Sequence, residues 1–189
     1  MADKVSEPAV TDAGEPAVRV IIPAAEIERR IGELAKEIVG ARLVRPILVP
    51  ILTGSFVFAA DLMRALHGAG LALEVDFLSL SSYRKSTTAS GKIDILRDLE
   101  IDVAGRDVLL VDDILDTGRT LAFAKDLVAA RGARRILTCV LLDKPVRRAV
   151  QCPADFKAFD CPPVFVVGYG MDIAHRYREL PFVGQVLTG

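Results

Sequence analysis

The chain has 189 residues, of which 51% are hydrophobic, and its formal net charge is −1. These values suit a single domain with a sizeable core, and the near-neutral charge argues against a broad, non-specific grip on nucleic acid, although it leaves room for a local basic patch. No uninterrupted apolar run approaches the roughly 20 residues that span a bilayer, and the acidic N-terminus does not fit a secretory signal, so we expect a cytoplasmic protein with no membrane partner.

The first part of the chain divides into a polar leader and the start of an ordered domain. Residues 1–17 are rich in Ala, Asp, Glu, Pro and Gly and show no apolar period, which predicts a disordered leader before one domain at 18–189. Beyond the leader, apolar residues at helical spacing predict helices, and continuous apolar runs predict strands buried on both faces. In chain order we expect a strand at Val18–Ile22, a helix at 24–40, a strand at Pro46–Leu52 and a helix at Phe56–His67.

The same alternation continues through the rest of the chain. A long strand is expected at Leu73–Ser81 and another at Ile93–Leu99. Between them, Ser82–Lys92 is polar and nearly devoid of apolar residues, which predicts an exposed, mobile loop of the kind that serves as a lid. The remaining predicted elements are a strand at Val108–Val111, a helix that reaches about Arg131, and strands at Arg135–Leu142 and Val164–Val167.

Buried strands that alternate with helices predict an α/β fold, in which a mainly parallel twisted sheet is flanked by helices. In such sheets ligands bind at the carboxyl ends of the strands. The loops after Leu52, Val111, Leu142 and Val167 should therefore converge on one site, and unusual polar residues occur at these places.

Cysteine and histidine are too sparse for several common kinds of site. The cysteines Cys139, Cys152 and Cys161 include no C-x-x-C pair, so reduced thiols in a cytoplasm fit better than disulfides. His67 and His175 lie far apart in the sequence, which argues against a zinc site or a Ser-His-Asp hydrolase.

The strongest signal is the segment Val108–Leu121, where four apolar residues are followed by three carboxylates and a small polar turn. The turn opens a helix, and the first turn of a helix presents free N–H groups and a positive dipole end to a phosphate. Gly118 allows the backbone to approach that phosphate closely. The carboxylates suit sugar hydroxyls and hard divalent cations. A solvated acidic loop capped by Thr117 is the alternative, but three acids at a buried strand end would then repel one another.

The order of residues in Val108–Thr120 is four apolar residues, two acidic residues, a short apolar spacer and then D-T-G-x-T. This order resembles the signature of type I phosphoribosyltransferases that binds phosphoribosyl pyrophosphate (PRPP). The resemblance implies the fold of that family, with a mobile catalytic loop and a small hood formed by the N-terminal strand and residues from about 145 onward.

Over roughly residues 18–187 the chain is similar in particular to the hypoxanthine-guanine branch of this family. The similar segments are a pyrophosphate loop at Leu52–Phe56, a Ser-Tyr pair at Ser82-Tyr83, a purine-recognising segment at Leu141–Lys144, a base-stacking and metal segment at Phe165–Asp172, and Arg178. The resemblance implies a purine salvage enzyme, which transfers the phosphoribosyl group from PRPP to N9 of hypoxanthine or guanine with Mg²⁺ and gives IMP or GMP and pyrophosphate. It also implies a homodimer or homotetramer.

The resemblance further implies roles for individual residues. Catalysis would involve Asp116 as the general base beside purine N7, with Ser82 and Tyr83 in the mobile loop. PRPP and its ribose phosphate would contact Asp112, Asp113, Ile114, Leu115, Asp116, Thr117, Gly118, Arg119 and Thr120.

The other implied contacts lie outside that segment. Pyrophosphate would contact Thr53, Gly54 and Arg178. The purine would contact Lys144, Phe165, Val166 and Asp172, and Mg²⁺ would be held by Asp112, Asp113 and Asp172.

The pyrophosphate loop departs from the branch at one position. Thr53 stands where a lysine is common, and in the family the peptide bond here can be cis without proline. Backbone N–H groups can still bind pyrophosphate, but the charge of the lysine and its contacts between subunits are lost.

Three other functions compete with this one. The first is an RNA-binding regulator that keeps the phosphoribosyltransferase fold, which should show a basic face. The second is a related enzyme for xanthine, adenine or uracil, and xanthine is the serious competitor. The third is a phosphatase-like enzyme with Asp112 as nucleophile, but the pair Asp112-Asp113 lacks the D-x-D spacing that such an enzyme needs.

Overall fold

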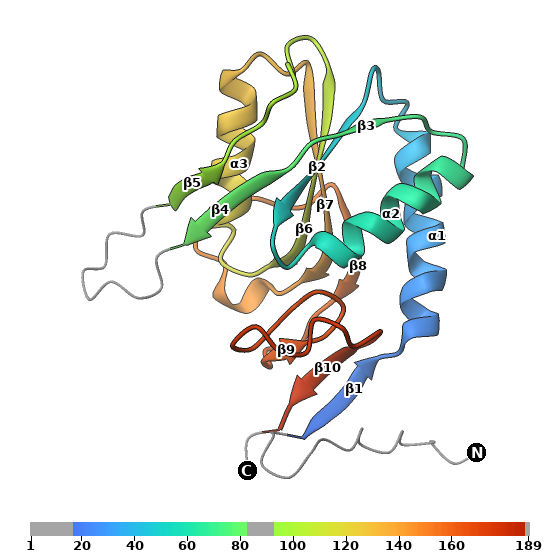
Figure 1. Cartoon of the computed structure of the whole chain (residues 1–189), viewed down its shortest axis with the longest axis vertical. Coiled ribbons are helices and arrows are strands. Elements are labelled where there is room, and N and C mark those ends of the chain that lie inside the picture. Colours follow the sequence, from blue (N-terminus) through green and yellow to red (C-terminus); the bar gives the residue numbers. More distant parts are fainter. Residues whose placement is uncertain (1–16, 83–92, 188–189) are drawn as a thin grey trace.

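The computed structural model of the chain describes residues 17–82 and 93–187 (Figure 1). Tyr83, most of the predicted loop and all but the last residue of the predicted leader therefore lie outside the described residues. The larger sheet consists of β2 (Ile47–Leu52), β3 (Glu74–Val75), β4 (Leu78–Ser82), β5 (Ile93–Arg97), β6 (Asp107–Leu115), β7 (Arg135–Asp143) and β8 (Phe156–Asp160).

The large sheet is mainly parallel. Its strand order is β5-β4-β2-β6-β7-β8, with β3 beside β2, and only the β4–β5 pair at one edge is antiparallel. The central strands are buried on both faces, as their continuous apolar runs predict. The predicted α/β class is therefore confirmed.

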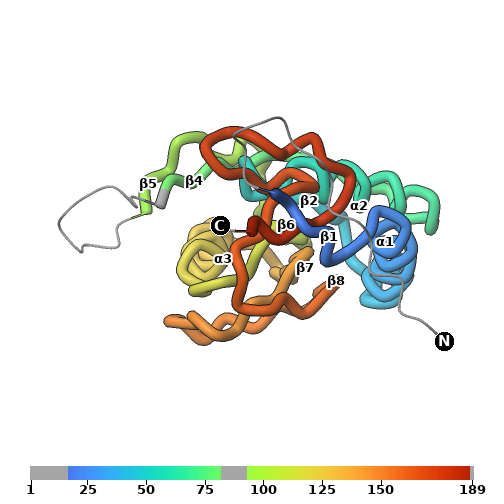
Figure 2. The backbone as a smooth tube through the Cα atoms, turned by 90° about the horizontal axis from the view of Figure 1, so that it is seen from below, coloured from blue at the N-terminus to red at the C-terminus, as the bar shows by residue number. Residues whose placement is uncertain are grey.

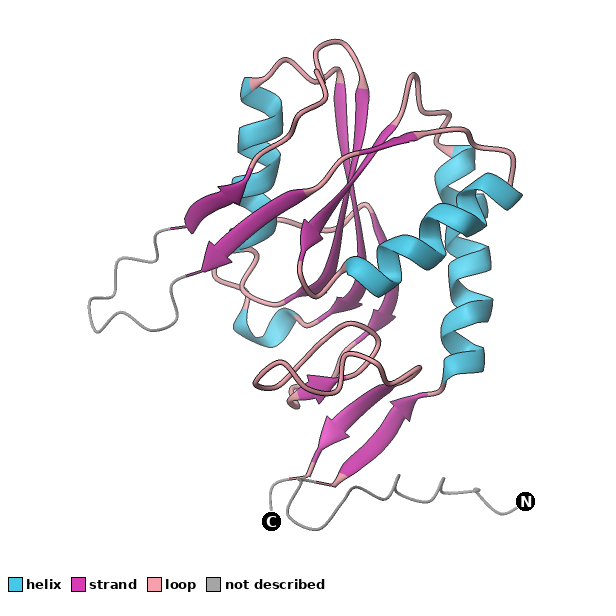
Figure 3. Cartoon of the chain, viewed as in Figure 1, coloured by secondary structure: helices cyan, strands magenta, loops and turns pink. Residues whose placement is uncertain are grey.

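Three helices cover the two faces of this sheet in the described part of the chain (Figures 2 and 3). α1 (Ala24–Gly40) and α2 (Phe56–Gly68) lie on one face, and α3 (Arg119–Ala130) lies on the other. Each helix buries the apolar positions that recur at its own period, as Ile27, Ile31 and Leu34 do in α1. The helices predicted at 24–40 and Phe56–His67 are thus confirmed. Within the described ranges, no helix combines the length and apolarity needed to cross a bilayer.

A small antiparallel sheet, which we call the hood, lies at the carboxyl edge of the large sheet (Figure 1). It consists of β1 (Val18–Ile22), β10 (Val183–Val186) and β9 (Val166–Val167), in that spatial order. The hood has a small core of its own that includes Val18, Val167 and Val186. We expected the hood to take in all residues from about 145 onward, but β8 pairs with β7 and extends the large sheet.

Two other expectations about strands are wrong. The strand predicted at Leu73–Ser81 is broken into β3 and β4 at Asp76-Phe77. The buried Asp76 carboxylate accepts hydrogen bonds from the backbone N–H groups of Phe77, Glu100 and Ile101, and these bonds replace ladder bonds at the break. The strand predicted at Val164–Val167 belongs to the hood and not to the parallel sheet.

Candidate active site

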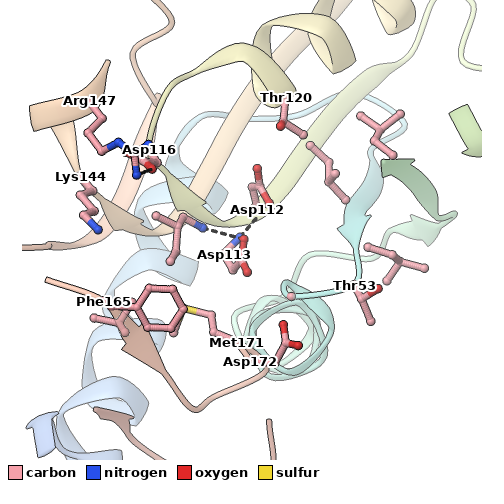
Figure 4. Close-up of a pocket in the computed structure, with 16 residues that line it drawn as sticks. Thr53, Asp112, Asp113, Asp116, Thr120, Lys144, Arg147, Phe165, Met171 and Asp172 are labelled. Atoms are coloured by element: carbon pink, nitrogen blue, oxygen red, sulfur yellow. Dashed lines mark hydrogen bonds and ion pairs between the residues drawn. The ribbon is translucent and has the colours of Figure 1, made fainter. Parts of the chain in front are cut away.

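A cavity of about 370 Å³ lies between the carboxyl edge of the large sheet and the hood. Side chains from the ends of β2, β6 and β7 and from the hood segment line it (Figure 4). The predicted convergence of these four chain segments is therefore confirmed, although the last of them arrives from a different sheet. The lining includes Thr53, Gly54, Asp112, Asp113, Ile114, Asp116, Thr120, Lys144, Arg147, Phe165, Val166, Met171 and Asp172.

Asp112 and Asp113 lie near the end of β6, and this strand runs four residues beyond the predicted end at Val111. Asp112 accepts a hydrogen bond from the Asp113 backbone N–H at 3.0 Å, and Asp113 accepts one from the Ile114 N–H at 2.8 Å. Burial raises the pKa of Asp112 well above its usual range, and the neighbouring charge of Asp113 raises it further. Burial also raises the pKa of Asp113. The pair is therefore poised to gain from a cation or a hydroxyl donor in the cavity.

The loop after β2 packs directly against this acidic pair. The peptide bond between Leu52 and Thr53 is cis, a form that the resemblance allows. A Cβ atom at Gly54 would lie 1.7 Å from Asp113 Oδ2, so only glycine fits there. A Cβ atom at Gly170 would in turn lie 2.3 Å from the Gly54 carbonyl oxygen. The hood, the loop after β2 and the end of β6 thus meet with no space for extra side-chain atoms.

The turn between β6 and α3, which we call the phosphate loop (Asp116–Thr120), forms a small cavity of about 80 Å³ with the end of β6. Gly118 precedes the first residue of α3 and has φ +80°, a conformation that favours glycine. Thr117 and Thr120 place hydroxyl groups around the small cavity, beside the N-terminus of the helix. Such an arrangement binds a phosphate group well.

Asp116 lines the larger cavity and has one carboxylate oxygen without a partner in the described part of the chain. Its Oδ1 atom is buried and has no hydrogen-bond partner among the described residues. Its Oδ2 atom lies 3.7 Å from Nη1 of Arg147, an exposed side chain at the cavity wall. A buried carboxylate oxygen without a partner is costly, so a ligand that donates a proton or hydrogen bond there would be favoured.

Lys144 and Phe165 lie at the end of the cavity opposite Thr53 (Figure 4). The Lys144 ammonium donates to the Val164 carbonyl oxygen at 2.8 Å, which holds the side chain beside the hood. The Phe165 side chain is 52% exposed, and it lines the cavity next to the buried Val166. An exposed aromatic face beside a fixed cation suits a flat heterocycle with a carbonyl oxygen.

Arg178 does not line this cavity. Its Nη2 atom lies 2.9 Å from Oδ1 of Asp172, and its Nη1 atom donates to the Gly170 carbonyl oxygen at 2.5 Å. It lines a neighbouring apolar groove between α1, α2 and residues 178–181. The second oxygen of Asp172 accepts the His175 backbone N–H at 2.7 Å. Of Asp172 and Arg178, only Asp172 lines the cavity. The ion pair with Arg178 holds the Asp172 side chain in place.

Comparison with known proteins decides the family. Residues 21–174 match the phosphoribosyl transferase domain family. The chain belongs to this family.

Several members of the phosphoribosyl transferase family are close relatives. The chain is 44% identical to the hypoxanthine phosphoribosyltransferase of Escherichia coli, over 90% of this chain and 96% of that protein. It is 41% identical to the hypoxanthine-guanine phosphoribosyltransferase of Bacillus subtilis, over 88% and 91% of the two chains. A crystal structure of a hypoxanthine-guanine phosphoribosyltransferase from Bacillus anthracis superposes with a TM-score of 0.83 at 38% identity, covering 89% of this chain and 98% of that one.

The structure of this phosphoribosyltransferase brings most of the predicted site residues together and leaves a few apart. The backbone of Ser82 ends β4, and Tyr83 lies outside the described residues. Among the described residues, no three of the His, Cys, Asp and Glu side chains gather as ligands of one metal ion, so Asp112, Asp113 and Asp172 do not form a ready-made cage.

Sequence reasoning missed part of the cavity lining. Arg147, Ile51 and Leu80 line the cavity, but none was singled out, and Met171 lay within the predicted segment Phe165–Asp172 without a role of its own. Arg147 lies in the 3-10 turn Pro145–Arg147, just after Lys144. Its position soon after a strand end was a usable signal, whereas Ile51 and Leu80 lie inside predicted strands and offered none.

Proposed function

We propose that this protein is a purine salvage enzyme that transfers the phosphoribosyl group from PRPP to N9 of hypoxanthine or guanine, giving IMP or GMP and pyrophosphate. The observation that carries the proposal is a single cavity lined by Asp116, which has an unpartnered buried oxygen, by Thr120 of the phosphate loop, and by Lys144 and Phe165. It is supported by the relatives at 41–44% identity, which are a hypoxanthine phosphoribosyltransferase and a hypoxanthine-guanine phosphoribosyltransferase.

The base would occupy the end of the cavity between the hood and Lys144. Lys144 would donate to the exocyclic O6 of a 6-oxopurine, which disfavours adenine because its amino group is itself a donor. Phe165 would stack on the ring, a contact worth about 1–3 kcal/mol for a base on an aromatic side chain. The backbone of Val166 would pair with the purine edge. These roles fit the fixed ammonium and the exposed ring at that end.

PRPP would occupy the other part of the cavity. The phosphate loop would bind its 5′-phosphate through backbone N–H groups and the hydroxyls of Thr117 and Thr120. Asp112 and Asp113 would accept hydrogen bonds from the ribose hydroxyls. The backbone of Thr53 and Gly54 would contact pyrophosphate, while Arg178 would act on it through Asp172.

We propose displacement at ribose C1′ through an oxocarbenium-like transition state, in which pyrophosphate leaves as N9 attacks. Asp116 would take the purine proton, and its buried, unpartnered oxygen is well placed for that task. General acid–base catalysis of this kind contributes about 10²–10⁴-fold. Closure of the loop that begins at Ser82 would keep water from hydrolysing PRPP.

The carboxylates fit Mg²⁺ in the way that substrate-bridged sites do. Mg²⁺ is usually held by one or two carboxylates together with substrate phosphates and water, so a complete protein cage is not needed. Asp112 and Asp113 would hold one ion beside the ribose hydroxyls, and Asp172 would hold a second, through water, near pyrophosphate. When bound, the metal would neutralise the charge that builds on the leaving group.

The decisive assay incubates the purified protein with PRPP and Mg²⁺ and with hypoxanthine, guanine, xanthine or adenine in turn, and follows nucleotide formation. We expect product with hypoxanthine or guanine and none with adenine. Efficient use of xanthine alone would replace the proposed substrate. No product with any base, together with PRPP binding, would favour the RNA-binding regulator instead.

Three further properties are proposed alongside the reaction. The partners are small molecules, and we propose neither a nucleic acid nor a membrane partner. The three buried free thiols, Cys139, Cys152 and Cys161, support a cytoplasmic location. A homodimer or homotetramer is the expected assembly, and light scattering on the purified protein would test it.

A further inference from the structure

The phosphate loop is held from behind by one short segment, Lys144–Val150, which we call the strap. Two groups of the strap donate to the Leu115 carbonyl oxygen: the Lys144 backbone N–H at 3.0 Å and Arg148 Nη2 at 2.9 Å. Arg148 Nε donates to the Asp116 carbonyl oxygen at 2.9 Å. The carbonyls that lead into the phosphate loop therefore face the strap.

The next carbonyl continues the pattern. The backbone N–H groups of Ala149 and Val150 both donate to the Thr117 carbonyl oxygen, at 2.9 and 3.0 Å. Gly118 lies against the same segment, because a Cβ atom there would be 2.6 Å from the Val150 carbonyl oxygen and 3.0 Å from Arg148 Cδ. Three consecutive carbonyls, from residues 115 to 117, are thus fixed on one side of the chain.

This arrangement fixes the direction of the N–H groups as well. In a planar trans peptide the C=O of one residue and the N–H of the next point in opposite directions. The N–H groups of Asp116, Thr117 and Gly118 therefore point away from the strap. The small cavity lies on that side, since its lining comes from β6, the phosphate loop and α3. The strap turns three donors toward the place where a phosphate would sit.

Arg148 is the strap residue whose side chain contributes to this arrangement, with one bond to each of the Leu115 and Asp116 carbonyl oxygens. Its side chain is only 13% exposed, and its Nη2 atom also contacts Asp143 Oδ1 at 2.5 Å. The planar guanidinium thus spans the carbonyls of Leu115 and Asp116 and one carboxylate at the end of β7, a fork that a lysine ammonium cannot reproduce. Asp143 directly precedes Lys144, so the same group links the phosphate loop to the lysine proposed to recognise the purine.

We propose that Arg148 is a positioning residue that orients the phosphate loop for binding of the 5′-phosphate, without touching substrate itself. The inference rests on the proposed function, because it assigns the loop to that phosphate. It predicts that loss of the guanidinium weakens binding of phosphorylated ligands selectively. A merely structural role would weaken ligands with and without the phosphate alike.

The test measures the dissociation constants of IMP and inosine by isothermal titration calorimetry for the full chain and for Arg148→Gln. These ligands differ only in the 5′-phosphate, so the ratio of their affinities reports on the phosphate loop. We expect this ratio to fall about tenfold or more in Arg148→Gln, the size expected when a charge-assisted hydrogen bond is lost. Inosine affinity should change far less.

Two further variants sharpen the test. Arg148→Lys keeps the charge but loses the fork, so we expect an intermediate ratio, and this comparison carries the test if Arg148→Gln does not fold. Arg29→Gln removes the same charge from an exposed position on α1 and should keep the ratio of the unaltered protein. Circular dichroism would check the fold of each variant.

Each outcome has a distinct meaning. An unchanged ratio in folded Arg148→Gln, equal loss for IMP and inosine, or an Arg148→Lys ratio equal to that of the unaltered protein would overturn the inference. Failure of the unaltered protein to prefer IMP over inosine would instead contradict the proposed function, because the phosphate loop would then bind no phosphate.

Discussion

At the scale of single residues, the site contains buried carboxylates that lack a hydrogen-bond donor or a compensating cation among the described residues, and a ligand would supply these. Asp116 has an unpartnered oxygen, and burial raises the pKa values of both Asp112 and Asp113, to which the charge of Asp113 adds in the case of Asp112. Such groups destabilise the ligand-free protein, and the contacts of a bound ligand offset this destabilisation. Substitutions at these positions should therefore separate activity from stability.

Asp116→Asn should lower kcat by about 10²–10⁴-fold, because the amide cannot accept the purine proton. PRPP binding should change far less, since the loop backbone is retained. Steady-state kinetics with both substrates would measure this split. Asp126→Asn makes the same change on the exposed face of α3 and should leave kcat unaltered. Equal losses in kcat and in PRPP affinity would argue against the base role.

Asp113→Asn should stabilise the ligand-free protein while impairing PRPP binding. Burial is the main cause of the raised pKa of Asp112, and the charge of Asp113 adds to it, so removing that charge should stabilise the fold by about 0.5–2 kcal/mol, the range of common stabilising substitutions. Urea unfolding at neutral pH, without and with PRPP and Mg²⁺, would show both effects. A ligand-free variant that is less stable than the unaltered protein would contradict this account of the pair.

At the scale of elements, local patterns predicted what lies in the core of the large sheet and failed where distant segments pair. The runs that became β2, β6 and β7 were visible because strands buried on both faces are continuously apolar. β8 and β10 were not predicted. β8 spans only five positions and has a single buried residue, Ala158, and β10 contains a glycine and pairs with β1 from the far end of the chain.

The site was predicted to a similar degree and for similar reasons. The phosphate loop is contiguous, so its residues could be read from one motif, and the placement of Lys144 and Phe165 followed from strand ends and resemblance. The position of Arg178 behind Asp172 depends on how the 168–181 segment folds back on itself. Tertiary hydrogen bonds of that kind leave no periodic trace in the sequence.

The break between β3 and β4 gives a prediction about pH. Burial alone would raise the pKa of Asp76, but the N–H groups of Ile101, Phe77 and Glu100 and the nearby Arg97 hold it below its usual value. A lowered pKa in the folded state stabilises the fold above the unfolded-state pKa, and this contribution is lost as pH falls through the folded value. Asp76→Asn should therefore cost about 1.5–3 kcal/mol at neutral pH.

The pH series provides the check. Urea unfolding from pH 7 down to pH 3 would measure the difference in the free energy of unfolding between Asp76→Asn and the unaltered protein. This difference should shrink below about pH 4, where the carboxyl of the unaltered protein takes up a proton. Asp94→Asn on the neighbouring strand offers a matched change at a carboxylate outside the break. A difference in the free energy of unfolding that stays constant over this range would show that the charge of Asp76 does not stabilise the chain at the break between β3 and β4.

At the scale of the whole molecule, the cavity is a joint between two sheets. The large sheet supplies Asp112, Asp113, the phosphate loop and Lys144, and the hood segment supplies Phe165, Val166 and Asp172. The two parts touch where Gly170 meets Gly54, and inside the hood Gly168 has φ +91° and would place a Cβ atom 2.1 Å from the Phe182 carbonyl oxygen. Disturbing the hood should thus affect one half of the site more than the other.

Gly168→Ala should raise KM for the purine while leaving the affinity for PRPP nearly unchanged. The added methyl group forces the hood strand away from Phe182 and moves Phe165, whereas the phosphate loop lies on the other sheet. Initial-rate kinetics for the base and calorimetry with PRPP and Mg²⁺ would separate the two effects. Gly32→Ala in α1, where a Cβ atom meets nothing within 4 Å, is the control. Parallel losses for both substrates would show that the two halves do not act separately.

Because the hood would hold the face of the base through Phe165 and Val166, while the large sheet would hold the sugar phosphate, the distance between N9 and C1′ depends on how the hood packs on the large sheet. Movement of the hood relative to the large sheet would then change the distance between these two reacting atoms. Reacting atoms need to approach within about 3–3.5 Å, and a displacement of about 1 Å can cost 10²-fold in rate. The close contact between Gly170 and Gly54 fixes the distance between the hood and the large sheet. It therefore sets the effective concentration that one bound substrate has at the reacting atom of the other.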